Sequence, residues 1–167
     1  MLSDTHHYID DAILNHAKQA DEIWHAGDIG SIAVADELAA LKPLRAVYGN
    51  IDDDKVRISY PEHLRFTIEG LDVWMTHIGG YPGHYAPPIR KSLQEKTPGL
   101  FICGHSHILR VIRDPKFGML TMNPGAAGVH GFHHVRTMLR FSIHDRKVSE
   151  LDVIELGLRG TLPQSVG

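Results

Sequence analysis

Five short blocks rich in metal-ligand residue types are spaced along the 167-residue chain, each directly after an apolar run that is typical of a strand. The blocks are Asp4-Thr5-His6, Gly27-Asp28, Gly49-Asn50, Thr76-His77 and Gly104-His105-Ser106-His107. Carboxylate, imidazole and amide side chains bind divalent transition metals. A pair of such ions can activate water at neutral pH and neutralise a phosphate at the same time. The pattern therefore predicts a two-metal centre for hydrolysis.

The blocks differ in how specifically each one indicates metal binding. The block from Gly104 to His107 is the most specific, since two imidazoles flanking one small residue after a buried strand have few structural uses. In an extended segment, residues i and i+2 point to the same side, so Asp4 and His6 can converge on one ion. Asp28 offers two oxygens that can bridge two metals. The two remaining blocks, taken alone, would be ordinary turns.

Helices and strands alternate in the first fifty residues. The predicted elements are a helix over 9–20, a strand over 22–26, a helix from an N-cap at Ser31 to Leu41, and a strand over 44–48. This alternation indicates βαβ units and a parallel sheet, which binds ligands beyond the carboxyl ends of its strands. If Asp4 follows a further strand, that strand consists of residues 1–3 only, and we call it the N-terminal stub. Either the sheet tolerates such a short strand or the natural protein begins a few residues earlier.

The second half is expected to be richer in strands. The predicted elements are a hairpin of 64–68 and 71–75 around Glu69-Gly70, a helix over 89–95, a strand over 100–103, paired strands over 109–112 and 119–122, and a closing hairpin of 137–143 and 148–156. The Pro/Gly-rich loop 79–88 is the expected rim of a substrate cleft. Because no repeat or linker interrupts the chain, we predict one α/β domain with two sheets over residues 1–167.

Composition and charge exclude several classes of protein. A formal charge of -3 and a pI near 6.5 provide no basic field for coating nucleic acid, so we expect no such partner. No apolar run approaches the roughly 18 residues that cross a bilayer, and no signal segment opens the chain, so we expect a cytoplasmic protein without membrane contact. Cys103 lies in an apolar run and is expected to be a buried hydrophobe, not a reactive thiol.

In order and context, the blocks resemble the signature of the calcineurin-like metallophosphoesterases: Asp-x-His, Gly-Asp, Gly-Asn-x-(Asp/Glu), Gly/Thr-His and Gly-His-x-His. The match runs from Asp4 to His107, and Asn123-Pro124-Gly125 is similar to a turn of the small, compact phosphodiesterase branch of that family. The resemblance implies a four-layer α/β sandwich of two mixed sheets flanked by helices. It also implies a phosphoesterase for a small-molecule substrate, a phosphodiesterase more than a monoesterase, and is compatible with a homo-oligomer.

The resemblance also implies a ligand set, in which a hydroxide between two metals attacks phosphorus. Asp4, His6 and His107 would hold one metal, Asn50, His77 and His105 would hold the other, and Asp28 would bridge them. Asp28, Asn50 and His77 are the residues to which we assign catalysis. Oxygen and nitrogen ligands without thiolate suit Mn²⁺, Fe²⁺, Zn²⁺, Co²⁺ or Ni²⁺, among which we expect Mn²⁺. Placing His105 and His107 on different ions requires the chain to bend between them.

The chain departs from the family pattern at Ile51, where many members have a histidine that stabilises the transition state or protonates the leaving group. Isoleucine does neither, so we expect slow turnover of phosphates with poor leaving groups. Asp52 matches the acidic position of the motif and is expected to support a ligand histidine instead of binding metal. For His25, a similar supporting role and simple strand packing are equally good interpretations.

Other histidines lie near the blocks in the sequence. His130, His133 and His134 follow the Asn-Pro-Gly turn, and one of them could reach the cleft and replace the missing acid. We favour the interpretation that they are surface loop histidines. His7 would point away from the metals if its segment is extended.

A protein-interaction scaffold is the competing interpretation, since the retromer subunit of this fold resembles the enzymes. The metal site of that scaffold is incomplete, whereas all seven candidate ligands are present here, which favours the enzyme. A complete site with Ile51 could still bind metal and turn over poorly, as a catalytically weak scaffold. A metal-dependent oxidoreductase or a nonphosphate hydrolase has little support in the residues.

Overall fold

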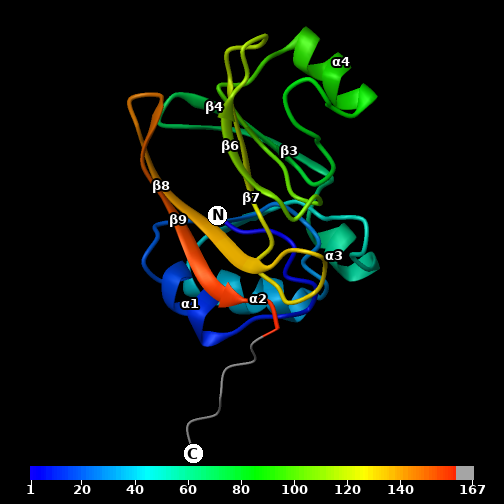
Figure 1. The fold of residues 1–167 in the computed structure, drawn as a ribbon, viewed down its shortest axis with the longest axis vertical. Coiled ribbons are helices and arrows are strands. Elements are labelled where there is room, and N and C mark those ends of the chain that lie inside the picture. Colours follow the sequence, from blue (N-terminus) through cyan, green and yellow to red (C-terminus); the bar gives the residue numbers. More distant parts are fainter. Residues whose placement is uncertain (161–167) are drawn as a thin grey trace, which may run out of the picture.

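The computed structural model describes residues 1–160 of the chain. In chain order its elements are α1 (Asp11–Ala17), β1 (Ile23–His25), α2 (Ile32–Leu41), β2 (Leu44–Ala46), α3 (Asp54–Ser59), β3 (His63–Ile68), β4 (Leu71–Thr76), α4 (Pro87–Glu95), β5 (Leu100–Ile102), β6 (Leu109–Arg113), β7 (Leu120–Pro124), β8 (Val135–His144) and β9 (Lys147–Leu158). Figure 1 shows α1 and α2 at one end of the molecule and α4 at the other, with the strands between them.

The N-terminal stub, residues 1–3, joins two pairs of strands into one layer. β1 and β2 are parallel, and β8 and β9 are antiparallel. Leu2 forms a parallel bridge with His25 of β1. On its other side, the Met1 amine donates to the Leu139 carbonyl of β8 at 2.8 Å, and the Leu139 N–H donates back to Met1 at 2.9 Å. The sheet therefore tolerates the short first strand, because both neighbours hydrogen-bond to it.

The second sheet is mixed, with the strand order β3-β4-β5-β7-β6. Its three central strands β4, β5 and β7 are parallel, and the outer strands β3 and β6 pair antiparallel to them. The β3–β4 hairpin turns at Glu69 and Gly70, as predicted, and both residues have positive φ (48° and 74°). The carboxyl ends of β4 and β5 consequently lie side by side at one edge of this sheet.

Three apolar clusters separate four layers. The first lies between α1, α2 and the layer that holds β1, the second between the two sheets, and the third between the second sheet and α4. Alternate residues of one strand enter different clusters: Val73 and Met75 face the other sheet, whereas Trp74 between them faces α4. The predicted α/β sandwich of two sheets flanked by helices is confirmed.

The helices differ from the sequence-based predictions in extent. The first helix is shorter than predicted because it begins after Asp10, whose side chain accepts the Ile13 N–H at 3.0 Å as an N-cap. α3 was not predicted. It has only six residues and its Ile58 is exposed, so its apolar residues do not repeat with a helical period. The longest helix has ten residues, and within residues 1–160 no helix has both the length and the apolar character that a bilayer crossing requires.

Cys103 should resist alkylation in the folded protein. Its side chain is buried against Gly80, and burial raises the pKa of the thiol to about 12. Near pH 8 only about one thiol in 10,000 would then be ionised. We expect iodoacetamide, followed by mass spectrometry, to label the folded protein far more slowly than protein unfolded in urea. Equal labelling rates would contradict the buried environment.

Candidate metal centre

The ends of parallel strands bring the five blocks together. Asp4 follows the stub, Gly27-Asp28 follows β1, Gly49-Asn50 follows β2, His77 follows β4 and Gly104-His105 follows β5. Backbone hydrogen bonds link neighbouring blocks, from Asp4 N–H to the Gly27 carbonyl and from Gly104 N–H to the His77 carbonyl, each at 3.0 Å. The two sheets meet where the His105 N–H donates to Asp4 Oδ2 at 3.1 Å. The blocks are therefore adjacent, as the positions at strand ends predicted.

Six of the seven predicted ligands form two adjacent groups. One group is Asp4, His6 and His107, and the other is Asp28, His77 and His105. Within each group, one potential ligand atom from each residue lies within 4.8 Å of the others. The first group matches the set that the family resemblance implies for one ion. The second group combines the expected bridging carboxylate with two histidines of the other ion.

Two buried carboxylates face histidines of both groups. Asp28 Oδ2 lies 3.2 Å from His77 Nε2 and 3.6 Å from His6 Nε2. Asp4 Oδ1 lies 3.2 Å from His107 Nε2 and 4.0 Å from His77 Nε2. A carboxylate in such a position can be shared between two cations.

Asn50, the seventh predicted ligand, lies on the loop after β2 with its side chain exposed. The next residue, Ile51, donates its N–H to Asp28 Oδ1 at 3.1 Å, so this loop contacts the second group. Arg57 holds the loop, because its guanidinium donates to the carbonyls of Gly49 and Asn50 at 3.2 and 3.1 Å. The role of Asn50 as a metal ligand stays a prediction.

Five candidate ligands have a left-handed backbone. Their φ values are 55° for Asp4, 47° for His6, 54° for Asp28, 68° for His105 and 57° for His107. Residues other than glycine rarely adopt this region, and such strain gathers at functional sites. Asp4 and His6 converge, as predicted. The predicted cause was wrong, because the segment is not extended at these two residues. His105 and His107 reach different groups because the chain bends between them, as expected.

The unpaired atoms of the centre fit a bound cation. Asp4 Oδ1 and His77 Nε2 are buried, and neither has a hydrogen-bond partner within the described part of the chain. His77 Nδ1 donates to the Ala26 carbonyl at 2.8 Å, so in a neutral ring the Nε2 lone pair faces carboxylate oxygens. His6 Nε2 and His107 Nε2 face each other at 3.3 Å. A divalent cation would satisfy these opposed acceptors together.

The electrostatics of the centre also favour positive charge. Burial alone would lower the pKa of His77, but the carboxylates of Asp28 and Asp4 outweigh it and raise that pKa. Burial would raise the pKa of Asp28, yet His77 and the Ile51 N–H hold it below its usual value. For His6, burial outweighs the attraction of Asp28 and Asp4 and lowers the pKa. The charge of Asp28 therefore persists in the buried site, where a cation can bind.

His25 supports two of the ligand-bearing loops. It is fully buried, and burial lowers its pKa to about 3, so the ring is neutral. Nδ1 accepts the Gly27 N–H at 3.2 Å, which leaves Nε2 to donate to Thr5 Oγ1 at 2.9 Å. Thr5 in turn donates to the Ile29 carbonyl at 3.0 Å. Of the two interpretations left open by the sequence, the structure supports a positioning role for His25.

The prediction that Asp52 supports a ligand histidine was wrong. Its buried carboxylate accepts three backbone N–H groups, from Ile29 at 3.2 Å, Gly30 at 2.6 Å and Gly49 at 2.7 Å. These groups belong to the loops after β1 and β2, which are parallel neighbours. Asp52 therefore fixes the loop of Asp28 against the loop of Asn50.

Two of the loop histidines lie beside ligand histidines. The ring of His130 is 4.9 Å from the ring of His6, and the ring of His133 is 5.2 Å from that of His107. His133 also contacts the Gly128 carbonyl at 3.0 Å. His130 is exposed and His133 is half-buried, as expected for loop histidines at the surface. Their contacts with His6 and His107 also support the alternative that one of them reaches the cleft. His134 and His7 are exposed and belong to neither ligand group.

Asn123 was noted in the sequence only as part of a turn, but it orders the loop that carries His105 and His107. Its Nδ2 donates to the Gly104 carbonyl at 2.8 Å and to Ser106 Oγ at 3.1 Å. Its Oδ1 accepts the Gly125 N–H at 2.9 Å. The Asn-Pro-Gly spacing was the available signal, since a side chain that closes its own turn can also brace a neighbouring loop.

Known proteins share both the sequence pattern and the fold. Residues 1–146 match the family model of the calcineurin-like phosphoesterase superfamily domain. A probable metallophosphoesterase from Methanothermobacter thermautotrophicus is 31% identical over 136 residues, which cover 77% of this chain and 76% of that protein. Wild-type Vps29 from Entamoeba histolytica, complexed with zinc, has a TM-score of 0.69 at 16% identity and covers 93% of this chain and 97% of its own. An archaeal phosphodiesterase has a TM-score of 0.67 at 19% identity, with coverage of 92% and 96%.

The chain belongs to the calcineurin-like phosphoesterase superfamily, which confirms the resemblance. The solved structures include both a phosphodiesterase and Vps29, so the shared fold does not choose between these two kinds of protein. The functional conclusion therefore depends on the residues of the site.

Replacing Asp52 by alanine should destabilise the protein by about 2–4 kcal/mol, because three buried N–H groups lose their acceptor. Urea unfolding of the variant and its parent measures this difference. Asp54→Ala is the control, since that carboxylate is exposed and its loss should change stability by no more than about 0.5 kcal/mol. Equal effects of the two substitutions would show that the Asp52 contacts do not hold the loops.

Proposed function

We propose that this protein is a phosphoesterase that uses two metal ions and prefers phosphodiesters. The observation that carries the proposal is the convergence of two adjacent ligand groups on the shared carboxylates of Asp4 and Asp28. The family membership supports a metal-dependent hydrolase of phosphate esters. The name of the archaeal structural neighbour, a phosphodiesterase, supports the choice of diesters.

In this proposal Asp4, His6 and His107 hold one ion, Asn50, His77 and His105 hold the other, and Asp28 lies between them. Two bound divalent ions supply a nucleophile from water at neutral pH and neutralise charge on the phosphate. The chain keeps the ligands in place: the Ala26 carbonyl orients His77, and the Ile51 N–H orients Asp28. Mn²⁺ is the ion that we propose, and the zinc-bound Vps29 neighbour makes Zn²⁺ the first alternative.

Ile51 limits the substrates that we expect. Its backbone N–H contacts Asp28, while its side chain is 40% exposed and has no proton to donate. A leaving group that departs as a stable anion needs little protonation, whereas an alkoxide needs an acid. We therefore propose that activated aryl diesters are cleaved faster than alkyl phosphates.

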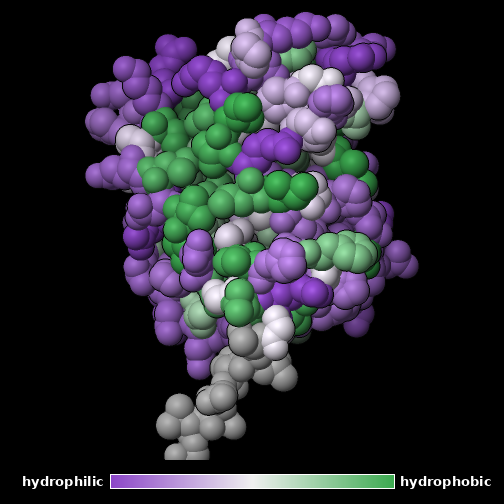
Figure 2. Space-filling model, viewed as in Figure 1, coloured by the Kyte–Doolittle hydropathy of each residue, from purple (hydrophilic) through white to green (hydrophobic). Residues whose placement is uncertain are grey.

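A protein-interaction scaffold is the second candidate, supported by the likeness to Vps29. Figure 2 shows hydrophobic residues gathered across the middle of one face, over the region of β8 and β9. Exposed apolar side chains on strands include Val111 and Ile112 of β6 and Val153 of β9. Such a surface suits a partner protein. The ligand groups favour the enzyme, and the next experiment separates the two candidates.

Asp28→Asn should abolish most of the activity, because it keeps the size of the side chain but removes the shared negative charge. We expect about two metals per chain in the parent by elemental analysis, and fewer in the variant. Hydrolysis of bis(4-nitrophenyl) phosphate should fall at least about 100-fold. Asp54→Asn, which changes an exposed carboxylate, is the control and should leave both values unchanged. Stoichiometric metal without hydrolysis of any phosphoester in a panel would favour the scaffold.

Ile51→His should raise turnover of substrates with poor leaving groups. A positioned acid contributes about 10²–10⁴-fold, and we expect a gain of at least about tenfold for alkyl phosphates over 4-nitrophenyl diesters. Steady-state kinetics on the metal-loaded parent, Ile51→His and the control Ile51→Leu would measure it. If the parent already hydrolyses alkyl monophosphates as fast as nitrophenyl diesters, the inference from Ile51 is wrong.

A further inference from the structure

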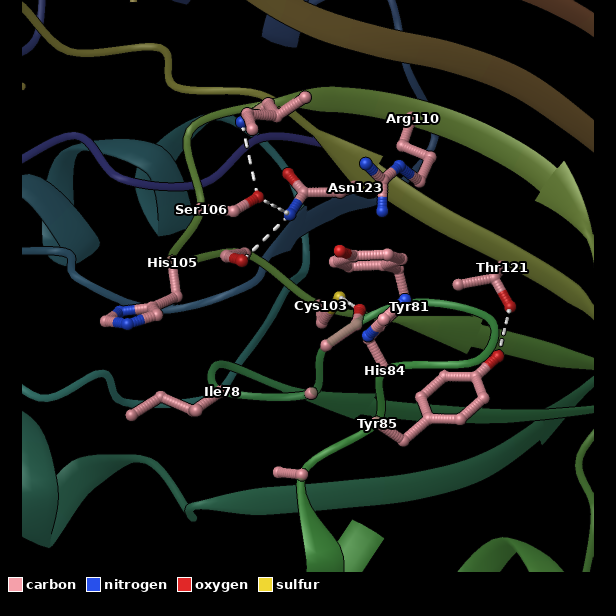
Figure 3. Close-up of a pocket in the computed structure, with 15 residues that line it drawn as sticks. Ile78, Tyr81, His84, Tyr85, Cys103, His105, Ser106, Arg110, Thr121 and Asn123 are labelled. Atoms are coloured by element: carbon pink, nitrogen blue, oxygen red, sulfur yellow. Dashed lines mark hydrogen bonds between the residues drawn. The ribbon is translucent and has the colours of Figure 1, made fainter. Parts of the chain in front are cut away.

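A pocket borders the candidate metal centre at His105 (Figure 3). Its volume is about 300 Å³, and its walls come from residues 78–86, from the loop of residues 103–106, and from β6 and β7. The Pro/Gly-rich loop that was predicted to form the rim of a cleft thus lines this pocket. Because His105 belongs to the second ligand group, a molecule in the pocket would lie beside the proposed position of the phosphate.

Arg110 brings a positive charge into this pocket from β6. Its guanidinium carbon lies 3.9 Å from the centroid of the Tyr81 ring, a cation–π contact that orients the guanidinium plane. The ring of His84 packs against Tyr81 at 4.8 Å, and Figure 3 shows Tyr81 between Arg110 and His84. The Tyr81 ring thus contacts both side chains while it stays 40% exposed, and the guanidinium presents N–H groups to the pocket.

No carboxylate among residues 1–160 forms an ion pair with Arg110. By contrast, the arginines that do form such pairs are Arg45, Arg65, Arg136 and Arg140. Asp114 on the same hairpin does not neutralise Arg110, because its oxygens accept the Tyr85 hydroxyl at 2.6 Å and the N–H groups of Lys116 and Phe117 at 2.7 and 2.9 Å. The charge of Arg110 is thus available to a ligand.

Two of the other polar groups of the pocket are committed to the protein. The Asn123 amide bonds to Gly104, Ser106 and Gly125, and the Cys103 thiol contacts the Gly80 carbonyl. Apolar side chains, among them Ile78 and Ile108, complete the walls. A planar fork of N–H donors matches carboxylate or phosphate oxygens, and the apolar walls suit a small ring.

We propose that this pocket binds one ester arm of the phosphodiester substrate and selects an arm that ends in a carboxylate or a second phosphate, which Arg110 binds. This inference rests on the proposed function, because His105 places the pocket beside the reacting phosphate. Tyr81 acts as a positioning residue, since it holds the guanidinium plane without contacting the anion itself.

Three mixed diesters that share the 4-nitrophenyl leaving group test the proposal. Their second arm is phenyl, 4-carboxyphenyl or 4-phosphonophenyl, and the two anionic arms distinguish a carboxylate from a phosphate-like group. We expect kcat/KM to be about 10- to 100-fold higher for at least one anionic arm than for phenyl. Arg110→Met should remove this preference, so that kcat/KM becomes similar for the three diesters.

Matched variants distinguish the specific role of Arg110 and Tyr81 from the general effect of removing a positive charge or a hydroxyl group. Arg113→Met removes an exposed positive charge from the same strand and should keep the preference. Tyr81→Phe keeps the aromatic face and should also keep the preference for an anionic arm. Tyr81→Leu removes that face and should weaken the preference. If Arg110→Met lowers hydrolysis of all three diesters equally, Arg110 acts on the shared phosphate and the proposal is wrong.

Calorimetry with two phosphonates gives a readout that does not depend on turnover. 4-Carboxybenzylphosphonate should bind the parent at least about tenfold more tightly than benzylphosphonate, and Arg110→Met should abolish the difference. If both phosphonates bind equally while all diesters are hydrolysed at similar rates, the subsite is refuted and the proposed function stands. If no diester is hydrolysed but the Arg110-dependent difference in binding persists, the subsite stands and the proposed function fails.

Discussion

The site depends on holding two buried carboxylates, Asp4 and Asp28, within reach of the same histidines. Acceptors opposed to one another away from water cost free energy unless a proton or a cation lies between them. The backbone offsets part of this cost, because the Ile51 N–H donates to Asp28 and the His105 N–H donates to Asp4. The unpaired atoms that remain define where a cation fits.

Loops must approach these carboxylates closely, and small or neutral residues make this possible. A Cβ atom on Gly49 would overlap the Asp28 carboxylate, and one on Gly104 would lie 2.9 Å from Asp4 Oδ2. His25 stays neutral in its buried position, so it joins two loops without adding charge to the centre. The oxygens of the Asp52 side chain accept backbone N–H groups instead of facing the centre. The supporting residues thus leave Asp4 and Asp28 free to interact with a cation.

The sequence predicted where most strands lie along the chain and that the blocks converge, because the first follows from apolar periodicity and the second from the direction of parallel strands. It did not predict the partners of Asp52 or the positions of His130 and His133. Those depend on loop conformations that distant segments impose, such as the left-handed backbone at Asp28. α3 escaped prediction for a related reason, since its N-cap Asp53 and a single buried residue, Val56, define it.

Ile51 and Arg110 together suggest how such a site could obtain its selectivity. Without an acid at Ile51, the barrier depends more strongly on the stability of the departing alkoxide or aryloxide. Binding energy from a part of the substrate that does not react can lower this barrier, provided that the binding interaction is stronger in the transition state than in the bound substrate. The pocket beside His105 offers such energy through a charge that no residue of the described chain neutralises. In the proposed function, the lack of an acid at Ile51 and the unpaired charge of Arg110 therefore act in the same direction, toward a narrow class of diesters.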